Sequence, residues 1–162
     1  MWRELSTLWQ SVRDPEYAHL LLESLPLYGL AFGLTLLVVS FVVNERKCRL
    51  LAFGFIFISC ASVWPYLDFR LEATPRILAT RAVSYGPIIQ AQTQLRQDTA
   101  WAFYLMAGIT LVALMMTKSR YAKFGILAVF VGGLLLFWFS VWLHKKECEV
   151  YHPNIIRNAT QR

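Results

Sequence analysis

The sequence has little charge and no recognisable pattern of catalytic or metal-binding residues. Charged residues make up 16% of its 162 residues, against about 25% in soluble domains. Hydrophobic residues reach 57%, against about 45–50%. It contains no Cys-x-x-Cys motif, phosphate-binding glycine loop, nucleophile beside a base or cluster of metal ligands. We therefore expect a protein that is not an enzyme.

Cysteine is also scarce. Cys48 and Cys148 fall on opposite membrane faces in the topology predicted below, and Cys60 lies within a predicted span. Neither a disulfide nor a thiol redox centre is therefore expected. No cleavable signal peptide is expected either, because residues 1–17 carry acids and lack an apolar stretch.

Apolar residues gather in four long runs instead of recurring at the period of a soluble helix. A membrane-spanning helix needs about 20 apolar residues, and each run is close to that length. The predicted spans are residues 20–43, 50–67, 99–116 and 124–143 of a single domain, residues 1–162. The fold class expected is all-α: an integral membrane four-helix bundle with short amphipathic surface helices.

Proline and residue periodicity predict how these spans begin and end. Asp14-Pro15 is typical of a helix start, and Pro26 is expected to kink the first helix. Pro65 is expected to end the second span. Short surface helices are predicted at residues 2–12 and, within the outer segment 68–98, at residues 75–84 and 88–97. Residues 145–162 are expected to form a polar tail.

The distribution of charge predicts the orientation of the bundle. The two short turns hold one acid, Glu45, and six basic residues, for a net charge of +5; these are Arg46, Lys47, Arg49, Lys118, Arg120 and Lys123. The opposite face holds ten basic residues and nine acids, a net charge of +1. The positive-inside rule places the short turns in the cytoplasm and both termini outside. The basic residues are interpreted as topology signals, so no nucleic-acid partner is expected.

Small residues on two spans predict close helix packing. Gly29 and Gly33 on the first span, and Ala128 and Gly132 on the fourth, have the small-x-x-x-small spacing that lets helix backbones approach one another. We interpret both pairs as packing within the chain, with a homodimer contact as the alternative.

A polar pair interrupts the first apolar run. His19 and Glu23 are four residues apart and share a helix face. Glu23 is the one carboxylate inside an apolar run, and ionisable residues at such depth are candidates for function. The structural interpretation, a salt bridge to Arg70, Arg96 or Lys145, is favoured because Glu23 lies near a helix end.

Three histidines raise the possibility of a cofactor. A b-type haem needs two axial ligands facing each other across a bundle. His19 could pair with His144 or with His152, because all lie at the outer ends of their helices. None lies deep in a span, so we expect no cofactor and keep one haem b as the alternative. A metal site from His19, Glu23 and His152 is disfavoured, since no short ligand spacing supports it.

Four segments carry a resemblance to known proteins: HLLL followed by PLYGLAFG within residues 19–33, SVWPY at 62–66, FYLMA at 103–107 and YHP at 151–153. The chain resembles small uncharacterised bacterial four-helix membrane proteins. It is similar, more distantly, to a numbered family of unknown function whose members begin with His-Pro and end in an aromatic-plus-His segment. The resemblance implies a bacterial inner-membrane location. Such relatives carry a histidine before the third span, whereas residues 92–97 here read QTQLRQ, which counts against a haem.

The function expected from these observations is that of a non-catalytic accessory or scaffold subunit of a larger membrane complex, with respiratory and photosynthetic assemblies as candidates. The aromatic share of 15% supplies side chains that could face lipid or partner helices. The lipid bilayer and other membrane subunits are the partners expected. The alternative is a small redox protein that binds one haem or a quinone at the outer rim.

Overall fold

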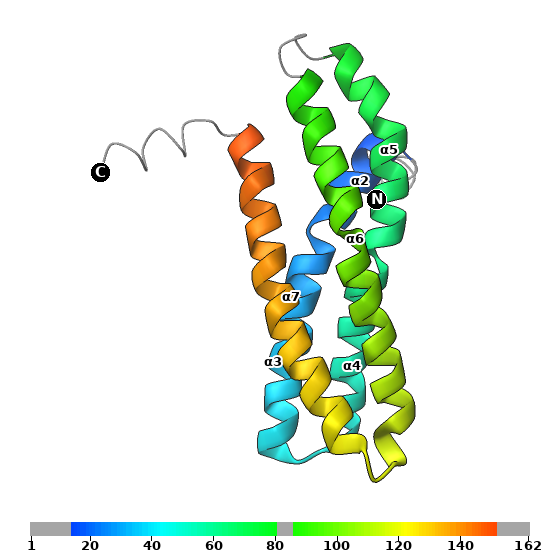
Figure 1. Cartoon of the computed structure of the whole chain (residues 1–162), viewed down its shortest axis with the longest axis vertical. Helices are drawn as coiled ribbons and strands as arrows, with labels where there is room; N and C mark the ends of the chain where they lie inside the picture. Colours follow the sequence, from blue (N-terminus) through cyan, green and yellow to red (C-terminus); the bar gives the residue numbers. More distant parts are fainter. Residues whose placement is uncertain (1–13, 81–85, 152–162) are drawn as a thin grey trace, which may run out of the picture.

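The computed structural model describes residues 14–80 and 86–151, and nearly all of them are helical (Figure 1). The helices are α2 (Pro15–Glu23), α3 (Leu25–Val43), α4 (Arg46–Ala61), α5 (Val63–Thr80), α6 (Gly86–Met115), the short 3-10 helix η2 (Met116–Lys118) and α7 (Ala122–Tyr151). The predicted helix at 2–12, His152 and most of the predicted tail lie outside the described residues.

The helices form four rods, each long and apolar enough to cross a membrane. The rods are α2 with α3, α4 with α5, α6 with η2, and α7, and they run alternately up and down (Figure 1). Both short connections lie at one end, here called the turn end. At the opposite end, here called the rim end, α2 begins, α5 ends, α6 begins and α7 ends. The all-α four-helix membrane fold predicted from the sequence is confirmed.

The first rod is broken where the sequence predicts a kink. The Asp14 side chain accepts a hydrogen bond from the backbone N–H of Glu16 at 2.9 Å, which caps α2 beside Pro15. Helix α2 ends at Glu23, and α3 begins one residue before Pro26. Proline lacks a backbone N–H and cannot donate to the preceding turn, so the break falls there.

The second and third rods differ from the sequence prediction. Pro65 does not end a helix, because it lies in the first turn of α5, where its missing N–H would have no partner anyway. Pro75 lies inside α5 and cannot donate a hydrogen bond to the carbonyl of Leu71, four residues earlier. It is tolerated there because both residues are exposed. The two short surface helices predicted at 75–84 and 88–97 were therefore wrong, since α5 extends to Thr80 and α6 is continuous from Gly86.

The fourth rod also continues beyond its predicted end at residue 143. Helix α7 has 30 residues, which is about 45 Å at 1.5 Å per residue. The apolar core of a bilayer is about 30 Å thick. With the turn end at one membrane surface, the last turns of α7 therefore reach the opposite interface. Part of the segment predicted as a polar tail is helical and belongs to the bundle.

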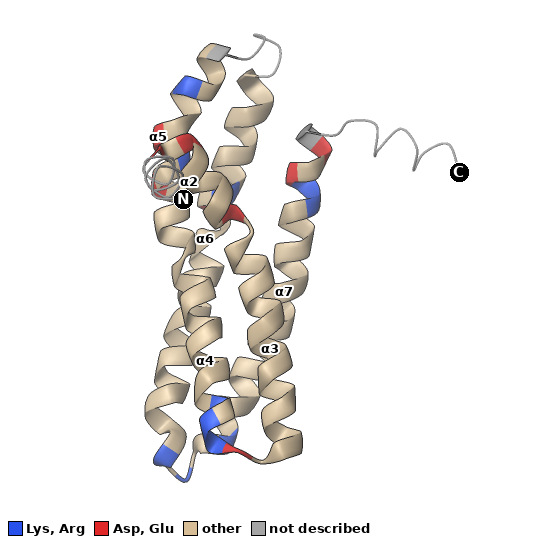
Figure 2. Ribbon diagram, turned by 180° about the vertical axis from the view of Figure 1, so that it is seen from behind, with Lys and Arg blue, Asp and Glu red and all other residues tan. Residues whose placement is uncertain are grey.

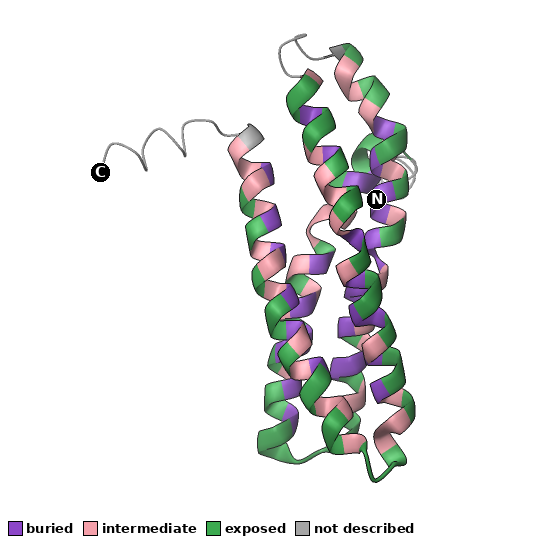
Figure 3. Ribbon diagram, viewed as in Figure 1, coloured by how far each residue is buried: buried purple, intermediate pink, exposed green. Residues whose placement is uncertain are grey.

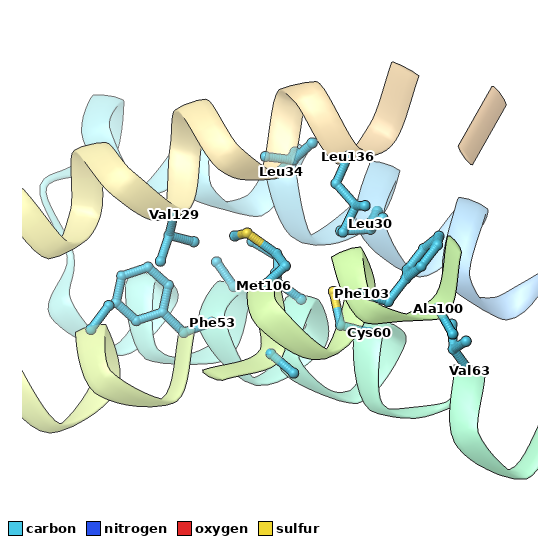
Figure 4. Close-up of a cluster of buried hydrophobic side chains, with 14 of the residues drawn as sticks. Leu30, Leu34, Phe53, Cys60, Val63, Ala100, Phe103, Met106, Val129 and Leu136 are labelled. Atoms are coloured by element: carbon cyan, nitrogen blue, oxygen red, sulfur yellow. The ribbon is translucent and has the colours of Figure 1, made fainter. Parts of the chain in front are cut away.

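The core lies between α3, α4, α6 and α7 in the middle of the bundle. Figure 4 shows Leu30, Phe53, Phe103 and Val129 turned into the interior, one from each of these helices, with Phe53 beside Val129 and Leu30 nearer Phe103. The outward faces of the same helices are exposed along much of their length (Figure 3). This pattern of a packed interior and an apolar exterior is the one expected for a bundle in lipid.

Glycines hold α3 against α4. A Cβ added at Gly29 would lie 1.9 Å from Ser59 Oγ, and one added at Gly33 would lie 2.6 Å from Ile56 Cγ1. Both glycines therefore allow a close approach within the chain, as predicted. On α7, a Cβ added at Gly132 would lie 3.0 Å from Met106 Sδ, whereas Ala128 is exposed.

Candidate functional site

The most unusual feature of the bundle is a cluster of buried charges at the rim end. Glu147 on α7 forms ion pairs with Arg70 on α5 and Arg96 on α6, one through each carboxylate oxygen. Glu147 and Arg70 are 2% and 5% exposed, and Arg96 is half-buried. We call these three residues, with Tyr66 and Glu23, the rim cluster.

Arg70 is the centre of the rim cluster. Its guanidinium also donates to the Tyr66 hydroxyl, and its Nε donates to Thr93 Oγ1 at 3.2 Å. Both arginines lie near the face of the Tyr66 ring, with each Cζ 5.8 Å from the ring centroid. Contacts of this kind between a cation and the face of an aromatic ring are attractive. The cluster therefore joins three rods through one carboxylate.

Glu23 contributes a second carboxyl group, but not the predicted ion pair. Arg70 and Arg96, its two predicted partners, both pair with Glu147. No ion pair to Glu23 occurs within residues 14–80 and 86–151, so that prediction was wrong in its partner. Glu23 lies beside the Glu147 carboxyl, within reach of a side-chain hydrogen bond, and both guanidiniums are close enough to interact with it.

The two histidines in the described part of the chain, His19 and His144, contact different partners. His19 is buried, and its Nδ1 lies 3.2 Å from the Pro15 carbonyl oxygen, which fits a donated hydrogen bond. His144 is half-buried, and its Nε2 lies 3.6 Å from Cys148 Sγ. His152 lies outside the described residues. Within the described part of the chain, no group of three or more His, Cys, Asp or Glu could hold a metal ion.

Sequence reasoning missed Glu147 because it assigned residues 145–162 to a tail. One signal could have found it. The buried residues of α7 follow a single helical face, and Leu136, Ser140 and Leu143 lead to Glu147 at steps of four, three and four. When this helical period is extended past the apolar run, it places the Glu147 carboxylate on the face of α7 that packs against the core. Glu147 lies about 38 Å from the start of α7, near the membrane interface, where such a cluster can reach water.

Two apolar hollows lie on the lipid-facing surface. One, of about 380 Å³, runs between α6 and α7 and includes Trp101, Leu105, Gly132 and Phe139 in its lining. The other, of about 510 Å³, lies on the outward face of α4, and its lining residues are Lys47, Leu50, Leu51, Gly54, Phe55 and Ile58. We call the second the Gly54 hollow.

Comparisons of the chain with protein-family models, with curated proteins and with solved structures find no match. The geometry of this chain therefore carries the assignment of function.

Proposed function

We propose that the protein is a non-catalytic accessory subunit of a larger membrane complex, and that it receives a transmembrane helix of another subunit in the Gly54 hollow. The observation that carries this proposal is the empty space in front of Gly54, since no atom of another helix lies within 4 Å of the position its Cβ would occupy. Glycine in a helix interior costs roughly 1 kcal/mol relative to alanine. Because Gly54 avoids no steric clash within the chain, its small size is better explained by a contact with another molecule.

The surroundings of Gly54 suit a partner helix. Gly54 lies about 12 Å from the start of α4 at 1.5 Å per residue, within the apolar thickness of a bilayer. Leu51 and Ile58, on either side of it, are 60% and 59% exposed. Small residues flanked by large apolar ones form the grooves in which membrane helices pack closely. The bilayer itself fills the hollow in the absence of a partner.

The rim cluster supports the same function. Its charges bind one another across three rods, which fixes the bundle as a rigid support. The Glu147 carboxylate and the Arg70 and Arg96 guanidiniums are used in these contacts, as expected of a structural centre.

The experiment compares two glycines with opposite surroundings. Gly54→Leu fills open space and should leave the melting temperature in detergent unchanged, while the chains that co-purify with the wild-type protein from its native membrane are lost. Gly33→Leu is the matched control, since it inserts the same side chain against Ile56 and Ala52 and should destabilise the bundle by about 1–3 kcal/mol. Retention of every partner by a folded Gly54→Leu protein contradicts the proposal. Loss of a second copy of this chain instead identifies a homodimer.

A second candidate function, a redox protein with one haem or a quinone at the rim, rests on His19. An imidazole that donates from Nδ1 to a carbonyl presents Nε2 as a ligand, an arrangement common among metal-binding histidines. Its partner ligand would be His144 or His152. An absorption spectrum of the protein purified from its native membrane tests this candidate, because a Soret band that His19→Ala abolishes would support it.

A further inference from the structure

A polar pocket lies at the turn end, far from the rim cluster. It has a volume of about 220 Å³ and lies between the connection of α3 to α4 and the connection of α6 to α7. Its lining residues are Asn44, Arg46, Arg49, Leu50, Thr117, Ala122 and Ile126. We call it the turn pocket. Figure 2 shows that the turn end is strongly basic, with blue residues gathered around a single red one.

The arginines of the turn pocket have no neutralising partner in the described part of the chain. All four ion pairs found there involve other residues. Arg49 Nε is also the single buried side-chain nitrogen or oxygen, among the described residues, that lacks a hydrogen-bond partner. Buried donors are nearly always satisfied, so an unpaired one indicates a missing acceptor.

The backbone adds further donors at the same place. Helix α4 begins at Arg46, and the side chain of its N-cap residue, Glu45, makes no capping hydrogen bond. The N–H groups of the first turn therefore remain available, at the positive end of the helix dipole. Asn44, held in the left-handed conformation at φ 53°, supplies a side-chain amide beside them.

We infer that the turn pocket binds a phosphate group through Arg46, Arg49 and the first turn of α4. A phosphate supplies the acceptors that the guanidinium groups lack, in the forked geometry that arginine prefers. The site lies at the level of a lipid headgroup, because both turns mark the end of the apolar spans. The phosphate can thus come from an anionic lipid or from solution, and both sources have the same chemistry.

The test uses the full-length protein, stripped of lipid in detergent, and measures bound species by native mass spectrometry. The probes are phosphatidylglycerol, phosphatidylcholine and inorganic phosphate. Arg49→Gln and Arg46→Gln should each weaken phosphate binding roughly tenfold, the loss expected for one hydrogen bond to a charged group. Arg120→Gln is the control, because it removes the same charge from the same end while its guanidinium contacts Tyr121 and not the pocket. Melting temperatures of all variants confirm that they are folded.

Each outcome decides the inference. Binding of phosphatidylglycerol that depends on Arg46 and Arg49 but not on Arg120 assigns a lipid site. The same dependence with inorganic phosphate alone assigns a soluble phosphate. Equal losses in all three variants, or no binding of any probe, overturn the inference, because the turn end would then attract anions by its net charge only.

Discussion

The two ends of the bundle use arginine in opposite ways. At the rim end, Arg70 is buried and bound to Glu147, Tyr66 and Thr93. At the turn end, Arg49 lines a pocket with its Nε buried and without a partner within the described chain. The rim cluster has its own counter-charge, brought by α7, whereas the turn pocket has none.

The two ends use arginine differently because the rods are held together by different means at each end. The rim end joins rods that are distant in sequence, and Arg70 and Glu147 are 77 residues apart. A buried charge there costs several kcal/mol unless it is paired, so the contact fixes how the rods are arranged. The turns at the other end connect neighbouring rods covalently and need no such contact. Arg46 and Arg49, which line the turn pocket and form none of the ion pairs found among the described residues, can act on the membrane or on a ligand.

The largest contrast between the ends is expected in thiol labelling. Cys48 belongs to the turn end and Cys148 to the rim end, and both are half-buried. A membrane-impermeant maleimide should label Cys48 only from the cytoplasmic side and Cys148 only from outside, since the distribution of charge predicts that the turns lie in the cytoplasm. Mass spectrometry of intact cells and of inverted vesicles measures this.

Cys60 is buried and serves as the silent control. Exchange of the two labelling sides would reverse the predicted orientation. Labelling of Cys48 and Cys148 from the same side would contradict the four-span topology itself.

The largest loss of stability should come from Glu147→Gln. The substitution keeps the shape of the side chain but leaves two buried guanidiniums without their shared carboxylate, at a cost of about 3–5 kcal/mol. Thermal unfolding in detergent measures the loss. Glu149→Gln is the control two residues away, where the carboxylate pairs with the exposed Lys145 and Lys146 and little change is expected. Equal melting temperatures for the two variants would show that the rim cluster does not hold the rods together.

The sequence predicted the spans better than the contacts at their ends. Long apolar runs indicate spans because a bilayer imposes one length on every helix. Glycine spacing likewise predicted that Gly29 and Gly33 contact a neighbouring helix, although it did not identify Ser59 or Ile56. Local signals worked where the cause is local, as at Asp14 and Pro26.

The ion pairs of the rim cluster could not be predicted from the sequence in the same way. Arg70, Arg96 and Glu147 come from three segments, and their meeting depends on how far α5, α6 and α7 extend beyond the membrane. Polar residues past an apolar run do not reveal whether a helix continues, because both a tail and a helix end are polar. The sequence therefore identified both arginines and assigned them the wrong carboxylate.

A smaller effect is expected for Glu23→Gln, which asks how much the second carboxyl group matters. Glu23 has no ion pair of its own among the described residues, and a glutamine amide can still donate to Glu147. The loss should be about 1 kcal/mol or less, measured as above. Glu16→Gln, on the exposed face of α2, is the control. A loss as large as that of Glu147→Gln would mean that Glu23 shares the guanidiniums directly.

The smallest effect should come from Arg49→Gln at the turn end. In lipid-free detergent the wild-type protein lacks the phosphate that we infer, so Arg49 contributes no ion pair and its unpaired Nε is unfavourable. Replacing it should change the free energy of unfolding by no more than about 0.5 kcal/mol, as at an ordinary surface position. Added phosphatidylglycerol should then raise the melting temperature of the wild type and not that of the variant, because a ligand stabilises only the state that binds it. If Arg49→Gln instead destabilises the lipid-free protein as strongly as Glu147→Gln does, Arg49 is a structural residue, and the two ends of the bundle do not differ in the way described.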